Sequence, residues 1–478
     1  MISAEYAPFA KTGGLADMVA GLCRTLAGAG HDVRVILPRY TSLTVDPQDR
    51  LPGSGLQIGA LQVSPVRVKN AHPGYHLLQA LTATGEPLIY QLDAPVLFGS
   101  GGIYGGGELE ARRFALLAHG ALRLCELLDW SPDIVHCHDW HAALVPGLLK
   151  RGYLQSRVFR SASSVLTLHN IGYQGVFPAA LAGELGLSTD PEGPQLNFLR
   201  AGILDADALT TVSPSHAAEI LTPEYGKGLE RLLRERRNRL VGILNGVDYA
   251  AWDPATDPRL PARYNPQDIS GKTACREALM ARADLNPQLR VPVLGMVTRL
   301  AEQKGIELVL DALPGLLRER GVQAVILGQG EERYSALLRQ LANAFPNLLR
   351  FFEVQDESLA RLVYAGADAF LVPSIYEPCG LTQMYALRYG AVPVVRETGG
   401  LKDTVRHFDA GSRTGNGSVF KHANGAGLTW ALRELLGWYR QPELWAQLRC
   451  NGMLEDYSWQ HQAPRYLTLY KQLTGGRQ

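Results

Sequence analysis

Residues 10–22, AKTGGLADMVAGL, place a lysine and two adjacent glycines directly before an apolar run with helical spacing. Glycine lets the backbone adopt positive φ and approach a ligand closely, because it has no Cβ. A helix that starts after such a turn presents unpaired N–H groups, which favour a phosphate. Lys11, Gly13 and Gly14 therefore indicate a phosphate site, although a tight turn without any ligand can carry the same residues.

A second copy of this motif occurs near the other end of the chain. TGGLKDTV at 398–405 repeats TGGLADMV at 12–19, with Thr, Gly, Gly, Leu, Asp and Val in matching places. One Gly-Gly turn is weak evidence of a binding site, but two copies in opposite halves of the chain favour two similar loops that bind one ligand. Gly399 and Gly400 thus join Gly13 and Gly14 as candidate binding residues.

Polar residues of other kinds follow several apolar segments. His136, His138, Asp139 and His141 come from HCHDWH, while Arg299 and Lys304 follow PVLGMV. Glu377 opens EPCGLTQ, in which Pro378 shapes a turn and Gly380 lets a helix N-terminus approach a sugar or phosphate. The crowded spacing of HCHDWH, with no matching set of cysteines or carboxylates, favours a strand end over a metal site.

Charge and composition exclude several classes of protein. The 478 residues contain 47 Lys and Arg against 46 Asp and Glu, a net charge of +1, so nothing favours nucleic acid or an acidic membrane surface. We find no apolar stretch long enough to span a membrane and no signal peptide. Six scattered cysteines make no disulfide framework or metal spacing, as is typical of reduced thiols in a cytoplasmic protein.

Apolar strands alternate with helical stretches along the chain, and the pattern restarts after residue 250. Expected strands are 32–38, 132–139, 163–170 and 206–214, then those that begin PVLGMV, QAVIL, DAFLV and AVPVV. Such continuous apolar strands separated by helices predict parallel sheets covered on both faces. Ligands of doubly wound domains bind outside the carboxyl ends of the strands, so two such domains would form the walls of one cleft.

Long collinear motifs show that the chain resembles bacterial glycogen synthases and plant starch synthases. They include KTGGLADMV, HCHDWHAAL, TLHNIGYQGVF, ILNGVD, TRLAEQKG, EPCGLTQMYALRYG and TGGLKDTV. The resemblance implies a GT-B architecture of two doubly wound Rossmann-like domains, at 1–242 and 243–454. A C-terminal helix at 455–478 is expected to pack back on the N-terminal domain.

The resemblance also implies an activity and its participants. Glucose would pass from ADP-glucose to the non-reducing end of an α-1,4-glucan, with retention at the anomeric carbon and without a metal or other cofactor. Arg299 and Lys304 would contact the diphosphate, Lys11 would belong to the donor site, and Glu377 would hold the donor glucose or support its developing positive charge. His169, at the glucose, would be a catalytic residue together with Glu377, Arg299 and Lys304. The remaining substrate-binding residues implied are Asp139 and Asn245 at the sugar, together with Gly13, Gly14, Asp17, Cys379, Gly380, Leu381, Thr382, Gly399 and Gly400.

Two departures from the family pattern stand out. The chain starts inside the first strand, so we expect the natural protein to begin several residues upstream. The family carries a Gly-Tyr pair whose tyrosine stacks on the nucleotide base, whereas this chain has Val354 and Gln355. Tyr364 is the nearby aromatic residue that could replace that tyrosine.

Two other functions remain open. One is a retaining transferase of the same architecture that uses UDP-glucose or another acceptor. The other is a catalytically silent glucan-binding protein, which the combination of Lys11, Arg299, Lys304 and Glu377 disfavours because binding alone needs no diphosphate machinery.

Overall fold

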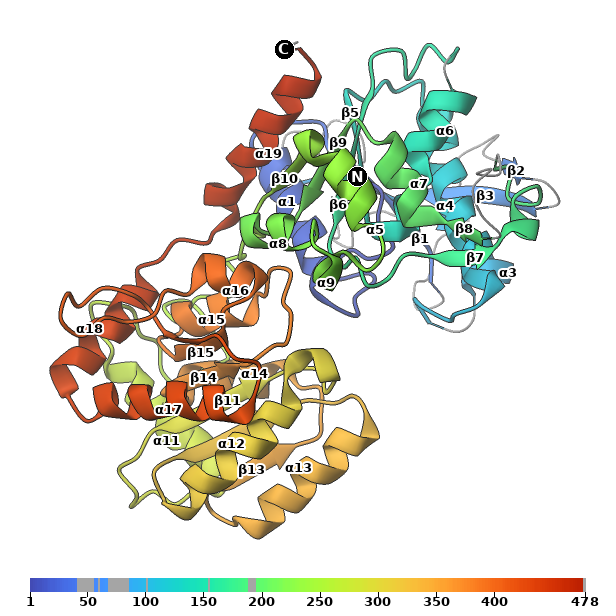
Figure 1. The fold of residues 1–478 in the computed structure, drawn as a ribbon. Helices are drawn as coiled ribbons and strands as arrows, with labels where there is room; N and C mark the ends of the chain where they lie inside the picture. Colours follow the sequence, from blue (N-terminus) through green and yellow to red (C-terminus); the bar gives the residue numbers. More distant parts are fainter. Residues whose placement is uncertain are drawn as a thin grey trace. The chain divides into compact units, whose positions relative to one another are not determined.

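The computed structural model describes residues 1–40, 56–58, 61–67, 86–99, 102–153, 155–187 and 195–475. They form two compact units, shown in Figure 1. Unit 1 comprises Met1–Gly246 together with Trp459–Gln478, and unit 2 comprises Val247–Ser458. The chain therefore passes between the units at Gly246–Val247, rather than at 242–243, and passes back at Ser458–Trp459.

The sheet of unit 1 consists of two four-stranded parts, ordered β1-β4-β3-β2 and β10-β9-β6-β5. Ile2 joins them, because it makes parallel bridges to Ile36 in β1 and to Cys137 in β5. Among these strands only β3 is reversed: it runs antiparallel to both of its neighbours, β2 and β4. The strands are β1 (Arg34–Pro38), β2 (Leu56–Ile58), β3 (Leu61–Arg67), β4 (Leu88–Asp93), β5 (Ile134–His138), β6 (Ser163–Leu168), β9 (Ala208–Thr211) and β10 (Leu240–Gly242).

Helices and a small hairpin complete unit 1. The hairpin pairs β7 (Val176–Pro178) with β8 (Gln195–Asn197). The helices α1 and α4 bury their apolar faces, as the spacing of their apolar residues predicts. The helices are α1 (Gly14–Gly28), α3 (Pro95–Phe98), α4 (Glu108–Leu127), α5 (Asp139–Ala142), α6 (Val145–Gly152), α7 (Phe198–Asp205), α8 (Pro214–Glu219), α9 (Pro223–Gly226) and α10 (Glu230–Glu235).

The C-terminal helix α19 (Trp459–Leu473) lies within unit 1 and packs against α1. The indole of Trp459 occupies a slot between two glycines. A Cβ on Gly21 would lie 2.0 Å from its Nε1 atom, and a Cβ on Gly246 would lie 2.5 Å from its Cδ2 atom. Glycine at both positions is therefore what admits the ring that fixes the helix.

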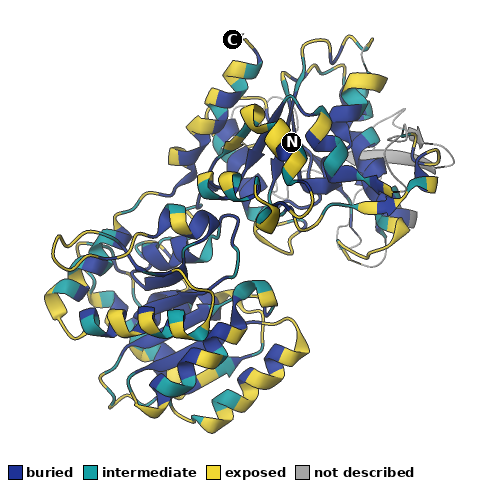
Figure 2. Ribbon diagram, viewed as in Figure 1, coloured by how far each residue is buried: buried dark blue, intermediate teal, exposed yellow. Residues whose placement is uncertain are grey.

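Unit 2 contains a six-stranded parallel sheet in the order β13-β12-β11-β14-β15-β16. This is the doubly wound order, in which the chain reverses direction across the sheet between β11 and β14. Figure 2 shows the buried strands between helices whose outer faces are exposed. The strands are β11 (Val293–Val297), β12 (Gln323–Leu327), β13 (Leu349–Phe352), β14 (Ala369–Val372), β15 (Val392–Arg396) and β16 (Ser418–Phe420).

Helices cover the sheet of unit 2, with α12 packed against α17 and α11 against α14. Covering helices are what an all-parallel sheet of apolar strands requires. The helices are α11 (Ser270–Arg282), α12 (Ile306–Arg318), α13 (Glu332–Ala344), α14 (Glu357–Gly366), α15 (Thr382–Arg388), α16 (Gly399–Thr404), α17 (Gly425–Tyr439) and α18 (Pro442–Met453).

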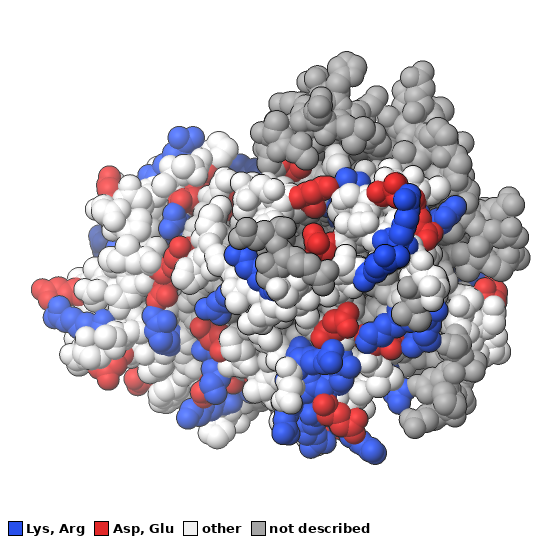
Figure 3. Space-filling model, turned by 90° about the horizontal axis from the view of Figure 1, so that it is seen from above, with Lys and Arg blue, Asp and Glu red and all other residues white. Residues whose placement is uncertain are grey.

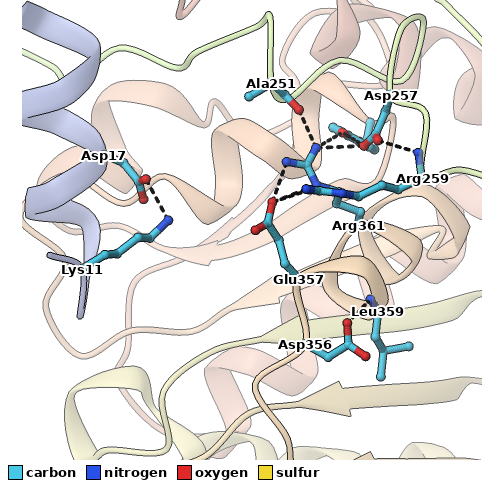
Figure 4. Close-up of polar contacts among 10 residues, drawn as sticks. Lys11, Asp17, Ala251, Asp257, Arg259, Asp356, Glu357, Leu359 and Arg361 are labelled. Carbon is cyan, nitrogen blue, oxygen red and sulfur yellow. Dashed lines mark hydrogen bonds and ion pairs between the residues drawn. The ribbon is translucent and has the colours of Figure 1, made fainter. Parts of the chain in front are cut away.

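A buried arginine fixes the start of unit 2 to helix α14. Arg361 donates to Asp257 at 2.9 Å, to Glu357 at 2.7 Å and to the carbonyl oxygen of Ala251 (Figure 4). Its guanidinium also lies 4.0 Å from the ring centroid of Trp252. Because the side chain of Asp257 is fully buried and Arg361 is its one charged partner among the described residues, loss of Arg361 would leave a buried carboxylate unpaired.

The distribution of surface charge and the state of the cysteines match what the composition predicts. Basic and acidic side chains are interspersed over the face drawn in Figure 3. All six cysteines are free, and five of them are buried. Within the described part of the chain, no helix combines the length and apolar character needed to cross a membrane.

Candidate active site

In unit 2, the candidate residues lie on loops at the carboxyl ends of β11 and β14, between which the strand order of the sheet reverses. The loop after β11 carries Arg299 and Lys304, and the loop after the neighbouring strand β14 carries Glu377. Parallel strands end at the same edge, so the two loops lie side by side. The predicted placement of these residues at strand ends is confirmed.

Lys304 and Glu377 form an ion pair of 2.6 Å between Nζ and Oε2. The hydroxyl of Ser374 donates to the same carboxylate oxygen at 2.8 Å. The exposed fraction is 22% for the lysine side chain and 9% for the glutamate side chain, so a ligand can reach the ammonium group. The pair is held firmly, since the backbone N–H of Ile375 donates to the carbonyl oxygen of Gln303 at 2.8 Å.

Arg299 is exposed at the start of the same loop, two residues after β11 ends. Among the residues that the structure describes, its guanidinium makes no hydrogen bond or ion pair. A guanidinium presents a fork of donors that matches two phosphate oxygens. Arg299 is therefore available to an anionic ligand without breaking an internal contact.

The two glycine-containing loops of unit 2 touch each other directly. The N–H of Gly400 donates to the carbonyl oxygen of Glu377 at 3.0 Å, and a Cβ on Gly400 would lie 2.1 Å from the carbonyl oxygen of Cys379. Gly399 has φ of 44°, as predicted for the second Gly-Gly turn. Leu381 and Thr382 follow at the start of α15, and both are partly buried.

Gln383 connects these loops, although sequence analysis did not single it out. Its amide nitrogen donates to the carbonyl oxygens of Cys379 and Gly380 and to the hydroxyl of Thr404, at 2.9–3.1 Å. Its buried amide oxygen has no hydrogen-bond partner among the described atoms. Nothing in its position within GLTQ separates it from an ordinary helix residue, so only the folded loops reveal this role.

The first Gly-Gly loop lies in unit 1 and differs from the prediction. Gly13 has φ of −154° and ψ of −163°, which is extended backbone, and Gly14 is the first residue of α1. The expectation of positive φ is wrong here, because the chain enters the helix directly from an extended segment. Lys11 forms an exposed ion pair of 2.7 Å with Asp17 (Figure 4).

Asp139 and His169 lie together at the carboxyl edge of unit 1. Asp139 has φ of 56°, and its carboxylate accepts hydrogen bonds from the backbone N–H groups of His169 at 2.7 Å and Asn170 at 3.3 Å. Burial raises the pKa of Asp139 from 3.8 to about 7, against the effect of those two N–H groups, and the nearby charge of Glu5 adds to the rise. Burial also lowers the pKa of His169 to about 3, so its imidazole is neutral near pH 7.

Of the other histidines of HCHDWH, His136 and His138 hydrogen-bond to neighbouring side chains, whereas His141 packs against aromatic rings. His136 contacts the hydroxyls of Tyr470 at 2.7 Å and Thr167 at 2.6 Å, while His138 lies 3.1 Å from His169 Nε2. His141 stacks near Tyr104 with ring centroids 5.1 Å apart. No group of three or more His, Cys, Asp or Glu in the described ranges has the arrangement of a metal site.

Asn245 follows β10 at the same edge of unit 1. It is buried, and its side-chain oxygen has no hydrogen-bond partner among the described residues. A buried amide oxygen without a partner is costly, so its presence indicates a group that a ligand or water satisfies.

The aromatic residue expected to replace the missing tyrosine is not available for that role. Tyr364 is buried and stacks on Phe370 with ring centroids 4.5 Å apart. Val354 and Gln355 are exposed, and Asp356 caps α14 by accepting from the N–H of Leu359 at 3.0 Å. Tyr364 is therefore a core residue, and the suggestion that it stacks on a base is wrong.

Two doubly wound units with polar clusters at the ends of their strands define a glycosyltransferase of the GT-B class. Residues 1–235 match the family model described as starch synthase catalytic domain, and residues 280–447 match glycosyl transferases group 1. The chain belongs to the glycogen synthase family.

Relatives match along their whole length. Glycogen synthase from Anaeromyxobacter dehalogenans is 43% identical over 100% of this chain and 99% of the relative. Glycogen synthase from Myxococcus xanthus is 44% identical over 99% and 98%. The catalytic domain of starch synthase IV from Arabidopsis thaliana, bound to ADP and acarbose, has a TM-score of 0.87 at 33% identity, with 98% of both chains covered.

Proposed function

We propose that this protein transfers glucose from ADP-glucose to the non-reducing end of an α-1,4-glucan, with retention of the anomeric configuration. The observation that carries the proposal is the Lys304–Glu377 pair on the same loops as Arg299, which has no partner in the described part of the chain, at the edge of unit 2 where β11 and β14 end. Family membership supports the same reaction, because the whole-length relatives are named glycogen synthases.

The proposed chemistry is the cleavage of a sugar–phosphate bond, which leaves negative charge on the departing diphosphate. Fixed cations that meet this charge lower the barrier more than flexible ones in water. Lys304 and Arg299 supply two such cations, and the carboxylate of Glu377 supports the positive charge that develops on the glucose. In this proposal no metal or other cofactor is needed, since these side chains neutralise the leaving group.

Several residues of unit 1 would bind the donor and its sugar. Neutral His169 can donate or accept a hydrogen bond with a glucose hydroxyl, and Asn245 offers its unsatisfied amide oxygen. Lys11 would exchange Asp17 for phosphate, beside Gly13 and Gly14. The remaining proposed substrate-binding residues are Asp139, Cys379, Gly380, Leu381, Thr382, Gly399 and Gly400.

ADP is the nucleotide that we propose for the donor. The starch synthase IV structure contains ADP, and its 33% identity covers nearly the whole chain. UDP-glucose remains the second candidate, because this chain has Val354 and Gln355 where the family has its Gly-Tyr pair. We further propose a cytoplasmic location, which the six free thiols support.

Incorporation of labelled glucose into glycogen tests the proposal. The protein is incubated with glycogen and either ADP-glucose or UDP-glucose, and label in the precipitated polymer is measured. We expect incorporation mainly from ADP-glucose, sensitive to exo-digestion from the non-reducing ends. Preferential incorporation from UDP-glucose would change the donor, and binding of glycogen without incorporation from either donor would indicate a silent glucan-binding protein.

A further inference from the structure

Glu5 is a buried carboxylate directly beneath the first Gly-Gly loop. One carboxylate oxygen accepts from the backbone N–H groups of Thr12 at 2.7 Å and Gly13 at 3.1 Å. The other accepts from the hydroxyls of Thr12 at 2.7 Å and Tyr104 at 2.5 Å. The exposed fraction of Glu5 is only 3%.

These four are the only hydrogen bonds that the described residues make to the carboxylate of Glu5, and none of their basic side chains forms an ion pair with it. A buried carboxylate without a counter-ion is tolerated only if hydrogen bonds satisfy it. The carboxylate and the loop therefore depend on each other: the loop supplies the donors, and the charge holds the loop in place.

This arrangement divides the N–H groups at the start of α1. Those of Thr12 and Gly13 point inward to Glu5, so they are not available to an external phosphate. Gly13 provides no side-chain cap, and α1 begins at Gly14, so the first turn of this 15-residue helix keeps N–H groups without a capping side chain. Lys11, whose side chain is 48% exposed, lies on the outer side of the loop.

We propose that Glu5 is a positioning residue for the phosphate-binding loop. It holds Thr12 and Gly13 from the protein side, so that Lys11 and the first turn of α1 face the diphosphate of the donor. Tyr104 is the second part of this support, because its hydroxyl binds the same carboxylate. The inference rests on the proposed function for its ligand, but the support of the loop itself does not depend on that function.

A double-mutant cycle with Lys11 separates positioning from general stability. Glu5→Gln replaces one carboxylate oxygen by a donor, which cannot accept from the loop. We expect kcat/KM for ADP-glucose to fall about tenfold or more, because hydrogen bonds to charged groups are among the stronger ones. If Glu5 acts through the loop that carries Lys11, Glu5→Gln should add little to Lys11→Ala. Effects that multiply in the double variant would contradict the proposal.

Two further variants test whether the effect of Glu5→Gln is specific to its contacts with the loop. Glu126→Gln makes the same chemical change in α4, where Glu126 accepts from Ser156 at 3.0 Å, and should leave donor kinetics unchanged. Tyr104→Phe removes one donor from Glu5 and should show a smaller loss of the same kind. KM for glycogen should stay within about twofold in all single variants.

Amide hydrogen exchange gives a readout that needs no turnover. In Glu5→Gln, exchange in residues 11–14 should become at least about tenfold faster, with the rest of α1 unchanged, because N–H groups without acceptors lose protection. Unchanged exchange there would overturn the proposal. If the parent protein failed to use ADP-glucose while this exchange still accelerated, the proposed function would be wrong and the loop support correct.

Discussion

At the scale of single residues, Asp139 is an acid in an unusual environment. Its carboxyl group is buried with a pKa of about 7, and its backbone has φ of 56°. A group whose pKa is higher in the folded state binds more protons there than in the unfolded chain, so ionisation lowers stability as pH rises from about 4 to about 7. Asparagine has nearly the same shape, tolerates positive φ and carries no charge.

The free energy of unfolding of Asp139→Asn, measured relative to that of the parent protein, should therefore increase as pH rises. A change in pKa from 3.8 to about 7 corresponds to roughly 4 kcal/mol, an upper limit for the difference between pH 4.5 and pH 8. Urea unfolding of both proteins at the two pH values measures it. An equal difference between variant and parent at both pH values would show that Asp139 has an ordinary pKa.

Gln355 gives a second prediction at this scale. It is exposed where the family has a tyrosine, and Tyr364 cannot substitute because it is buried. Stacking on an aromatic ring contributes roughly 1–3 kcal/mol to holding a nucleobase. Gln355→Tyr should lower KM for ADP-glucose by about tenfold, with kcat little changed; Gln355→Leu is the matched control without a ring. A KM that stays the same or rises would indicate that the base is held elsewhere.

Some of these residues could be predicted from sequence and others could not. Arg299, Lys304 and Glu377 each follow an apolar strand, so their shared edge follows from the doubly wound topology. Glu5 and Gln383 act through hydrogen bonds to loops that are adjacent only in the folded chain. An acidic residue among the apolar residues MISAEYAPFA was the one available signal for Glu5.

At the scale of elements, the two Gly-Gly turns share a sequence and differ in structure. Gly13 has φ of −154°, whereas Gly399, which matches it in the repeat, has φ of 44°. A Cβ on Gly13 would have no atom within 4 Å, whereas a Cβ on Gly400, the second glycine of the other turn, would lie 2.1 Å from a carbonyl oxygen. Gly400→Ala should destabilise unit 2 by about 1–3 kcal/mol through crowding. Gly13→Ala should cost less than about 1 kcal/mol, the usual loss at a helix N-cap.

Thermal unfolding of the two alanine variants measures this contrast. Loss of activity in Gly13→Ala with retained stability would report the close approach of a ligand to that loop. Equal destabilisation by both substitutions would contradict the loop geometry described above.

The strands that the sequence predicted are those with continuous apolar patterns. Every expected strand in 32–38, 132–139, 163–170 and 206–214 is present, as are the four of unit 2. The predictions missed eight strands, most of which are short or carry mixed polar residues: β2, β3, β4, β7, β8, β10, β13 and β16. The conformation of Gly13 was also missed, because a Gly-Gly pair permits positive φ without requiring it.

At the scale of the whole molecule, the two units differ in chain continuity. Unit 2 is one uninterrupted segment, whereas unit 1 needs residues after Ser458 to complete its core. Trp459, Ala463 and Tyr466 belong to the hydrophobic cluster that includes α1. Without them, the Trp459 slot and part of the sheet would be exposed to water.

We therefore expect a fragment of residues 247–458 to fold alone and a fragment of residues 1–246 to fail. Circular dichroism and urea unfolding should show a cooperative transition for the first and none for the second. Adding residues 459–478 to the second fragment through a flexible linker should restore cooperativity. A cooperative, stable 1–246 fragment would show that α19 is dispensable for unit 1.

The most direct test of the whole account is the turnover of Lys304→Ala at saturating ADP-glucose. If Lys304 meets charge that develops as the diphosphate leaves, the contact strengthens in the transition state and its loss lowers kcat. Removing one such preorganised partner typically costs about 10²–10³ in rate. For Lys304→Ala we predict a loss of this size in the rate of glucose incorporation into glycogen, while the Kd for ADP stays within a few-fold of the parent value. Lys304→Gln should recover little of the lost rate. Near-parental turnover in Lys304→Ala would show that Lys304 is only a surface lysine and would contradict the proposed mechanism.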